Sequence, residues 1–144
     1  MAHMLLILEE SQMRSSRPAG LAQERYEQMM AYGDSLKARG VYVASDSLGS
    51  DSLGVRISSR EGRRSVVDGP FAEAREIVGG YFLLNCATRE EAIALAHECP
   101  ACNWATVEVR NVSPCYMDAA ADDAALGDAA TTDAPADVAR ANAA

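Results

Sequence analysis

The stretch that decides the fold covers residues 64–86 and reads RSVVDGPFAEAREIVGGYFLLNC. It joins the polar turn Asp68-Gly69-Pro70-Phe71 to a Gly79-Gly80 pair and an apolar run over residues 81–86. Asp, Gly and Pro change the direction of a chain, each for its own backbone reason, and a glycine pair interrupts regular structure. The stretch therefore predicts a turn, a short helical segment over residues 72–77, a break and a buried strand.

The sequence before this stretch predicts a strand, a long helix and a second strand. The run HMLLIL at residues 3–8 is too short for a helix and predicts a strand buried on both faces. Residues 11–20 predict a polar loop. Residues 21–39 predict a helix that ends at Gly40. Its apolar stripe consists of residues at helical spacing: Ala22, Tyr26, Met29, Met30, Gly33 and Leu36.

Between this helix and the opening stretch, residues 41–44 predict a strand and the pentapeptide SDSLG occurs twice in tandem. The duplication at residues 45–54 lies between two predicted strands and predicts a lengthened loop. A calcium site is the alternative, but the spacing of Asp and Ser matches no calcium-binding loop. Residues 55–59 and 64–67 flank the turn Glu61-Gly62 and predict a hairpin.

The sequence after the opening stretch predicts a second helix and a last strand. Thr88-Arg89-Glu90-Glu91 reads as a capping box that begins the helix, and Pro100 ends it. Residues 103–112 alternate in polarity, as a strand with two different faces does. One predicted face carries Ala105, Val107 and Val109, and the other carries Trp104, Thr106, Glu108 and Arg110.

This order of elements predicts an α+β fold, a ferredoxin-like sandwich with a mostly antiparallel sheet and two helices on one face. The Ala/Val face of the last strand suits the helices, which places Trp104 and Tyr81 on the open face. An aromatic sheet face is rarely left in water. We therefore expect a homodimer in which two such faces close a dimeric α+β barrel.

Charge and composition divide the chain into a domain over residues 1–112 and an Ala/Asp-rich tail over residues 113–144, which we expect to be disordered. The net charge is −8, and six Asp against one Arg after residue 117 place −5 of it in the tail. The chain has no run of Lys or Arg, so we expect no nucleic-acid partner. No apolar run approaches the length of a membrane span, so we expect a cytoplasmic protein without membrane contact.

Several segments together resemble the YCII-related family, in its DGPF-motif branch. They are HMLLIL at residues 3–8, VVDGPFAE at 66–73, GGYFLL at 79–84, EEA at 90–92 and VEVR at 107–110. The resemblance implies a dimeric α+β barrel with a small-molecule pocket near the DGPF turn. Some members resemble lyases or dehydrochlorinases that use a His–Asp pair. Asp68 lies where the Asp would be, whereas the family's His has no counterpart in LAQERY at residues 21–26.

Asp68 and His3 are the candidate catalytic residues. A carboxylate at a strand end can act as a base or hold a ligand, and it can equally cap the turn through backbone N–H groups. His3 shares a strand face with Leu5 and Ile7. If that face is the open one, its imidazole faces a pocket; otherwise His3 is a surface residue near the terminus.

Four further residues are candidates for ligand binding on the open face: Tyr81, Trp104, Glu108 and Arg110. Glu108 and Arg110 are two residues apart and can instead pair with each other or across a dimer. The single CxxC at Cys99 and Cys102 ends a helix and has no second ligand pair, so we expect no metal and no cofactor.

The resemblance also leaves a second function open. Relatives of the DGPF branch are similar to domains associated with alternative sigma factors. The chain could therefore be a non-catalytic regulatory or interaction module linked to sigma-factor-dependent transcription.

Overall fold

A computed structural model describes residues 1–114, of which Met1–Val112 form one compact unit. The acidic tail that we expect to be disordered lies, from residue 115 onward, outside the described residues. The elements of the described part are β1 (Ala2–Glu10), α1 (Ser11–Ser15), α2 (Ala19–Ala38), β2 (Tyr42–Ser47), the 3-10 turn η1 (Asp51–Leu53), β3 (Val55–Arg60), β4 (Arg63–Asp68), β5 (Glu76–Asn85), α3 (Arg89–His97), the 3-10 turn η2 (Pro100–Asn103) and β6 (Thr106–Asn111).

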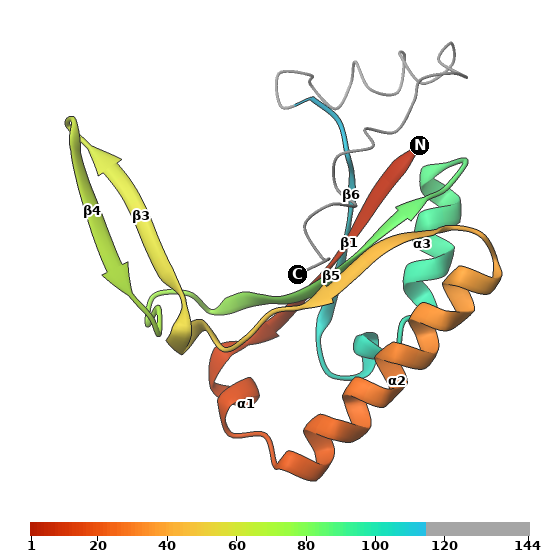
Figure 1. Cartoon of the computed structure of the whole chain (residues 1–144), viewed down its shortest axis with the longest axis horizontal. Helices are drawn as coiled ribbons and strands as arrows, with labels where there is room; N and C mark the ends of the chain where they lie inside the picture. Colours follow the sequence, from red (N-terminus) through yellow and green to blue (C-terminus); the bar gives the residue numbers. More distant parts are fainter. Residues whose placement is uncertain (115–144) are drawn as a thin grey trace, which may run out of the picture. The chain divides into compact units, whose positions relative to one another are not determined.

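The main sheet has four strands in the order β2-β5-β1-β6, and every neighbouring pair is antiparallel. Two split βαβ units, β1-α2-β2 and β5-α3-β6, interleave to give this order. Helices α2 and α3 lie on the same side of the sheet (Figure 1). The predicted α+β, ferredoxin-like sandwich is therefore confirmed. Strands β3 and β4 pair only with each other.

The core fills the space between the sheet and the two helices. Its buried apolar side chains come from both inner strands and both helices: Leu5, Ile7, Tyr32, Leu36, Phe82, Leu84, Ala92, Leu95 and Ala96. Tyr32 connects the three parts. Its hydroxyl donates to the Leu95 carbonyl at 2.8 Å, and its ring lies edge to face with the Phe82 ring, with 5.1 Å between the two centroids. The predicted helical stripe missed Tyr32 and included Tyr26, which is 56% exposed.

Strand β1 alternates between buried and half-buried residues, where the sequence predicted burial on both faces. His3, Leu5, Ile7 and Glu9 face the helices and are buried. Their neighbours in the strand, Met4, Leu6 and Leu8, are half-buried on the other side, which we call the open face. On this face Met4 pairs in register with Leu83 and Arg110, and Leu6 pairs with Tyr81 and Glu108. In the described part of the chain, no helix covers the open face (Figure 1).

The capping box of α3 is confirmed. The Thr88 hydroxyl accepts a hydrogen bond from the Glu91 backbone N–H at 3.1 Å, and the Glu91 carboxylate accepts one from the Ala87 N–H at 2.7 Å. The first bond satisfies a donor that the first turn of a helix leaves without an intrahelical partner, and the second fixes the residue before the N-cap.

Two predicted segments differ in the structure. Residues 72–77 are not helical, and β5 begins at Glu76, so that Gly79 and Gly80 lie inside the strand. The predicted loop at residues 11–20 contains α1 and the first turn of α2. The duplicated pentapeptide also divides: Ser45–Ser47 of the first copy extend β2, and the second copy forms η1.

The Tyr32 hydroxyl provides a first test of the core. Replacing Tyr32 by Phe keeps the ring against Phe82 and removes one of two hydrogen bonds to the Leu95 carbonyl, which still accepts from the Glu98 N–H at 3.1 Å. We expect a loss of about 1 kcal/mol in the free energy of unfolding, measured by urea denaturation. Tyr26→Phe, at an exposed position of the same helix, should change it by less than about 0.5 kcal/mol. Equal effects of the two variants would contradict this role of Tyr32.

Candidate ligand-binding cleft

The site is built on Glu9, a carboxylate that the alternation of β1 turns toward the helices. Glu9 is only 8% exposed. A buried carboxylate is costly unless it is paired, and two guanidinium groups pair with this one. Arg17 Nη2 lies 2.5 Å from Glu9 Oε2, and Arg14 Nη1 lies 3.7 Å from Glu9 Oε1. Both arginines reach Glu9 because the chain turns into α1 directly after the strand.

The glycine pair of β5 makes room for this cluster. A Cβ added at Gly79 would lie 2.4 Å from Arg14 Nη1 and 2.9 Å from Glu9 Oε1. A Cβ at Gly80 would lie 2.8 Å from the Asp46 carbonyl oxygen of the neighbouring strand. Gly80 is thus required for a close approach of two backbones, whereas a side chain at Gly79 would displace the ends of Arg14 and Glu9. Both glycines are part of the strand, where the sequence predicted a break.

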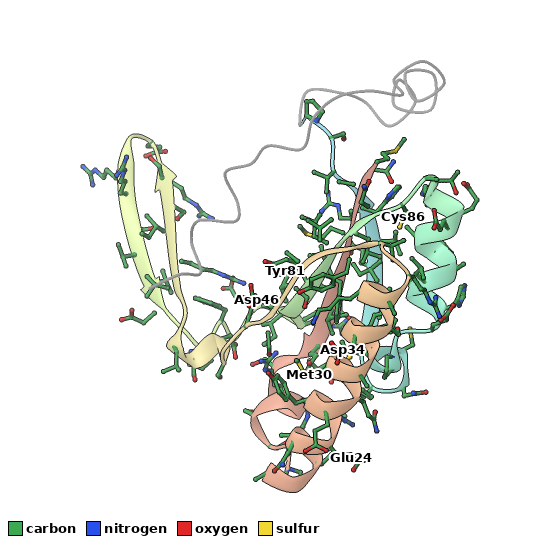
Figure 2. The ribbon with its side chains drawn as sticks, turned by 45° about the vertical axis from the view of Figure 1, so that its right-hand side comes forward. Glu24, Met30, Asp34, Asp46, Tyr81 and Cys86 are labelled. Atoms are coloured by element: carbon green, nitrogen blue, oxygen red, sulfur yellow. The ribbon has the colours of Figure 1, made fainter. Side chains whose placement is uncertain are left out.

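A cleft of about 510 Å³ opens beside the cluster, bounded by β1, β2, β5 and the first half of α2. This volume falls within the range of small-molecule sites. Its walls are partly apolar and partly cationic: Ile7, Ala22, Tyr26, Met29, Met30, Phe82 and Trp104, together with Glu9, Arg14, Arg17 and Arg25. Of the α2 stripe that the sequence assigned to the core, Ala22, Tyr26, Met29 and Met30 line this cleft. Leu36 lies in the core as predicted, and Met29 also packs against it. Figure 2 shows Met30 on α2 and the adjacent Asp46 and Tyr81 on the strands.

Trp104 lies on the helix side of the sheet, where it packs against the core and lines the cleft. Its prediction on the open face was wrong. Trp104 follows η2 with ψ near 0°, and β6 begins only at Thr106, so the strand alternation does not extend back to it. The guanidinium carbon of Arg25 lies 4.8 Å from the centroid of the Trp104 ring, a cation–π contact that holds both groups at the cleft wall.

The cleft carries an excess of positive charge. Arg14, Arg17 and Arg25 outnumber the carboxylates of Glu9 and Asp46 among its lining residues. The Nε of Arg17 is buried and has no hydrogen-bond partner within the described residues. Guanidinium N–H groups beside aromatic and aliphatic walls can bind a small organic anion, since they match a carboxylate with two parallel hydrogen bonds.

Asp68 lies apart from this cleft, at the exposed end of β4. Among the described residues its carboxylate has no hydrogen bond, so the structure does not show the predicted cap. The turn is held by backbone contacts. The Gly69 N–H donates to the Gly54 carbonyl at 2.9 Å, and a Cβ added at Gly69 would lie 1.8 Å from the backbone carbonyl oxygen of Asp51. Pro70 and Phe71 line a second hollow of about 1020 Å³, but Asp68 does not.

His3 lies on the face covered by the helices and is fully buried. It is therefore neither on the open face nor at the surface, the two positions that the sequence left open. Burial lowers the pKa of its imidazole from the usual 6.5. In the described part of the chain, neither ring nitrogen has a hydrogen-bond partner. His3 lines neither of the two hollows described above.

Tyr81, Glu108 and Arg110 lie on the open face, as predicted. The Tyr81 hydroxyl donates to the Asp46 carboxylate at 3.2 Å, and Arg110 Nε lies 3.7 Å from Glu108 Oε1. Of the six candidates from the sequence, Tyr81 and Trp104 line the cleft, so the six do not form one site. The residues that sequence reasoning missed are Glu9, Arg14, Arg17 and Arg25. The sequence does contain one indication of this cluster: Glu9 occupies the same strand face as Leu5 and Ile7, so its charge requires a partner on the buried side.

The described residues contain no group of three or more His, Cys, Asp or Glu side chains placed to hold a metal ion. Burial raises the pKa of the Cys99 thiol to about 11, which keeps it in the unreactive protonated form at neutral pH. Within the same range, no helix has the length and apolar character needed to cross a bilayer.

The fold is that of a small α+β domain with a cleft beside its sheet, and comparison with known proteins assigns its family. The profile of the YCII-related domain matches residues 1–116, so the chain belongs to the YCII-related family. No curated protein sequence matches it. Among solved structures, the chain is similar to 5-chloro-2-hydroxyhydroquinone dehydrochlorinase from Burkholderia phenoliruptrix AC1100 in complex with 2,5-dihydroxybenzoquinone, at 12% identity and a TM-score of 0.43, over 78% of this chain and 94% of that chain.

The buried His3 predicts how stability depends on pH. Because its pKa is lower in the folded state, the unfolded chain binds a proton first as the pH falls. We expect the free energy of unfolding to fall between pH 6.5 and the lower folded pKa, and then to level off for this group. His3→Leu should reduce this slope, whereas His97→Gln, at an exposed position, should retain it. Urea denaturation across this pH range measures the slopes; an unchanged slope in His3→Leu would refute the prediction.

Proposed function

We propose that this protein is a small-molecule-binding member of the DGPF-motif branch of its family, and that its ligand is a small organic anion held in the cleft. The observation that carries the proposal is the excess of guanidinium groups over carboxylates in a cleft with aromatic walls. The branch is supported by the DGPF tetrapeptide at residues 68–71 together with GGYFLL at 79–84.

The arrangement supports binding through three contributions. Glu9 orients Arg14 and Arg17, so that less conformational freedom is lost when a ligand binds. The unpartnered Nε of Arg17 offers a buried donor that a ligand oxygen would satisfy. Trp104, fixed by Arg25, offers a flat apolar surface for a planar group.

Lyase-type chemistry would need a proton acceptor at this position. Both carboxylate oxygens of Glu9 are already paired with guanidinium groups, which leaves neither of them directed at a ligand. Asp46 accepts a hydrogen bond from Tyr81. Binding is therefore the function that the cleft supports best, and lyase-type turnover is the finer possibility that the family suggests.

The single tryptophan of the chain makes the binding proposal directly testable. Because Trp104 lines the cleft, its fluorescence should change on titration with salicylate, a planar carboxylate, and much less with the neutral salicylamide. Arg17→Lys keeps a charge beside Glu9 but removes the planar fork, and we expect salicylate affinity to fall about tenfold. Arg110→Lys on the open face is the matched control and should bind like the parent. Equal binding of the amide, or an unaffected Arg17→Lys variant, would refute an anion site.

We also propose that the protein is a homodimer joined through the open face. Met4, Leu6, Leu8 and Leu83 form a half-buried apolar strip in the middle of the sheet. Polar residues of the outer strands, Asp46 on one side and Glu108 on the other, border the strip. Apolar strips with polar borders are typical of protein interfaces. Two such faces brought together would form the α+β barrel expected from the sequence.

Leu6 lies at the centre of this strip and tests the dimer. Leu6→Arg would place a charge in the apolar interface, and we expect a monomer at concentrations where the parent chain sediments as a dimer. Met13→Arg, at an exposed position on α1, is the control and should remain dimeric. Circular dichroism establishes that both variants fold. A parent chain that is monomeric at all concentrations, or a dimeric Leu6→Arg variant, would contradict the interface.

One observation favours the second candidate function, a non-catalytic regulatory or interaction module linked to sigma-factor-dependent transcription. No histidine lines either described hollow, so the family's His–Asp pair has no equivalent there. Absence of any fluorescence response to small anions would favour this candidate over the ligand-binding one.

A further inference from the structure

The β3–β4 hairpin carries side chains of different character on its two faces. Opposite residues in an antiparallel pair share a face, and faces alternate along each strand. Val55, Ile57 and Val66 therefore lie on one face, together with Ser59, Arg64 and Asp68. The other face carries Arg56, Ser58, Arg60, Arg63, Ser65 and Val67. We call them the apolar face and the basic face of the hairpin.

The apolar face is exposed although its sequence pattern is that of a strand packed on a core. Val55, Ile57 and Val66 are 54%, 69% and 65% exposed, and every residue of both strands is exposed. Strands that alternate in this way normally cover an apolar layer. Among residues 1–114, no such layer covers these two strands.

The hairpin is held at its base by its basic face. The Arg56 guanidinium lies 3.9 Å from the Phe71 ring of the DGPF turn, and the Gly69 N–H donates to the Gly54 carbonyl at 2.9 Å. Further along, the hydroxyls of Ser58 and Ser65 are 2.8 Å apart across the strands. These contacts engage one face and leave the apolar face free. A two-stranded sheet without further packing is marginally stable in water, which is a reason for it to bind a partner.

The charge of the hairpin selects the partner. The β3–β4 segment, residues 55–68, has four Arg against Glu61 and Asp68, which gives it a net charge of +2. The rest of residues 1–112 carries 13 acidic and eight basic residues, a net charge of −5. A second copy of the chain therefore offers an acidic body that attracts the basic arm as a whole. Three of the four Arg lie on the basic face, so this attraction acts around the apolar contact and not within it. In a closed twofold dimer each copy supplies one arm and receives one, which doubles the contribution of the contact.

We propose that the β3–β4 hairpin is a dimerisation arm whose apolar face packs on a second copy of this chain. The DGPF turn then serves to hold the arm, through Phe71 and Gly69, and not to supply a catalytic carboxylate. This inference rests on the proposed homodimer and adds to it a contact surface separate from the open face of the sheet.

Two neighbouring valines give a matched test. Val66 lies on the apolar face and Val67 on the basic face, with 65% and 53% of their surfaces exposed. The double variant Ile57→Ser/Val66→Ser should raise the dimer dissociation constant at least about tenfold, because two arms each lose apolar contact. Val67→Ser should stay within about twofold of the parent, as its face is not buried in the proposed contact. Sedimentation equilibrium measures all three constants, with circular dichroism as the test of folding.

A photo-crosslink locates the contact directly in the full chain. With benzoylphenylalanine in place of Ile57, irradiation should yield a covalent homodimer, and the same substitution at Val67 should yield far less. A parent dimer that Leu6→Arg dissociates, but whose dissociation constant the Ile57→Ser/Val66→Ser variant leaves unchanged, would overturn the arm and retain the sheet interface. A monomeric parent would overturn both. Crosslinks from position 57 that form only to other proteins in a lysate, and never to a second copy, would also overturn it.

Discussion

The arrangement of the candidate site depends on the pairing of one buried carboxylate with two guanidinium groups. Glu9 can face the helices only because Arg14 and Arg17 neutralise it, and both can reach it only because the chain turns into α1 at Ser11. The ends of Arg14 and Glu9 occupy the space in which a side chain at Gly79 would lie. The cleft is bounded by the same groups, so the charge balance that makes the buried carboxylate tolerable also determines what the cleft can bind.

The same domain has apolar surfaces of three kinds, each with a different physical setting. In the core beneath the helices, Tyr32 of α2 donates a hydrogen bond to the Leu95 carbonyl of α3 and so links the two helices. The cleft is apolar but carries guanidinium groups, which suits a small anion. The open face and the apolar face of the hairpin have no charged partner in their centres, and such surfaces suit protein contacts.

Much of the fold could be predicted from the sequence because its signals are local. The alternation of residues 106–111 and the capping box at Thr88 are each contained in a few neighbouring residues. The cleft could not be predicted from the sequence. Its arginines reach Glu9 because the chain turns back after β1, and no residue spacing in the sequence indicates this turn. Trp104 was misplaced for a similar reason: one residue with ψ near 0° changes the face on which a side chain lies, and composition does not reveal it.

The tandem SDSLG pentapeptides have a consequence for how the hairpin varies between related chains. Identical sequences form a strand edge in the first copy and a 3-10 turn in the second, so their surroundings and not their residues determine their shape. They connect β2 to β3, while the pairing of β1 with β5 and β6 involves neither copy. Five residues extend at most about 17 Å. Gain or loss of one unit would therefore alter the reach of the hairpin and leave the pairing of β1 with β5 and β6 unchanged.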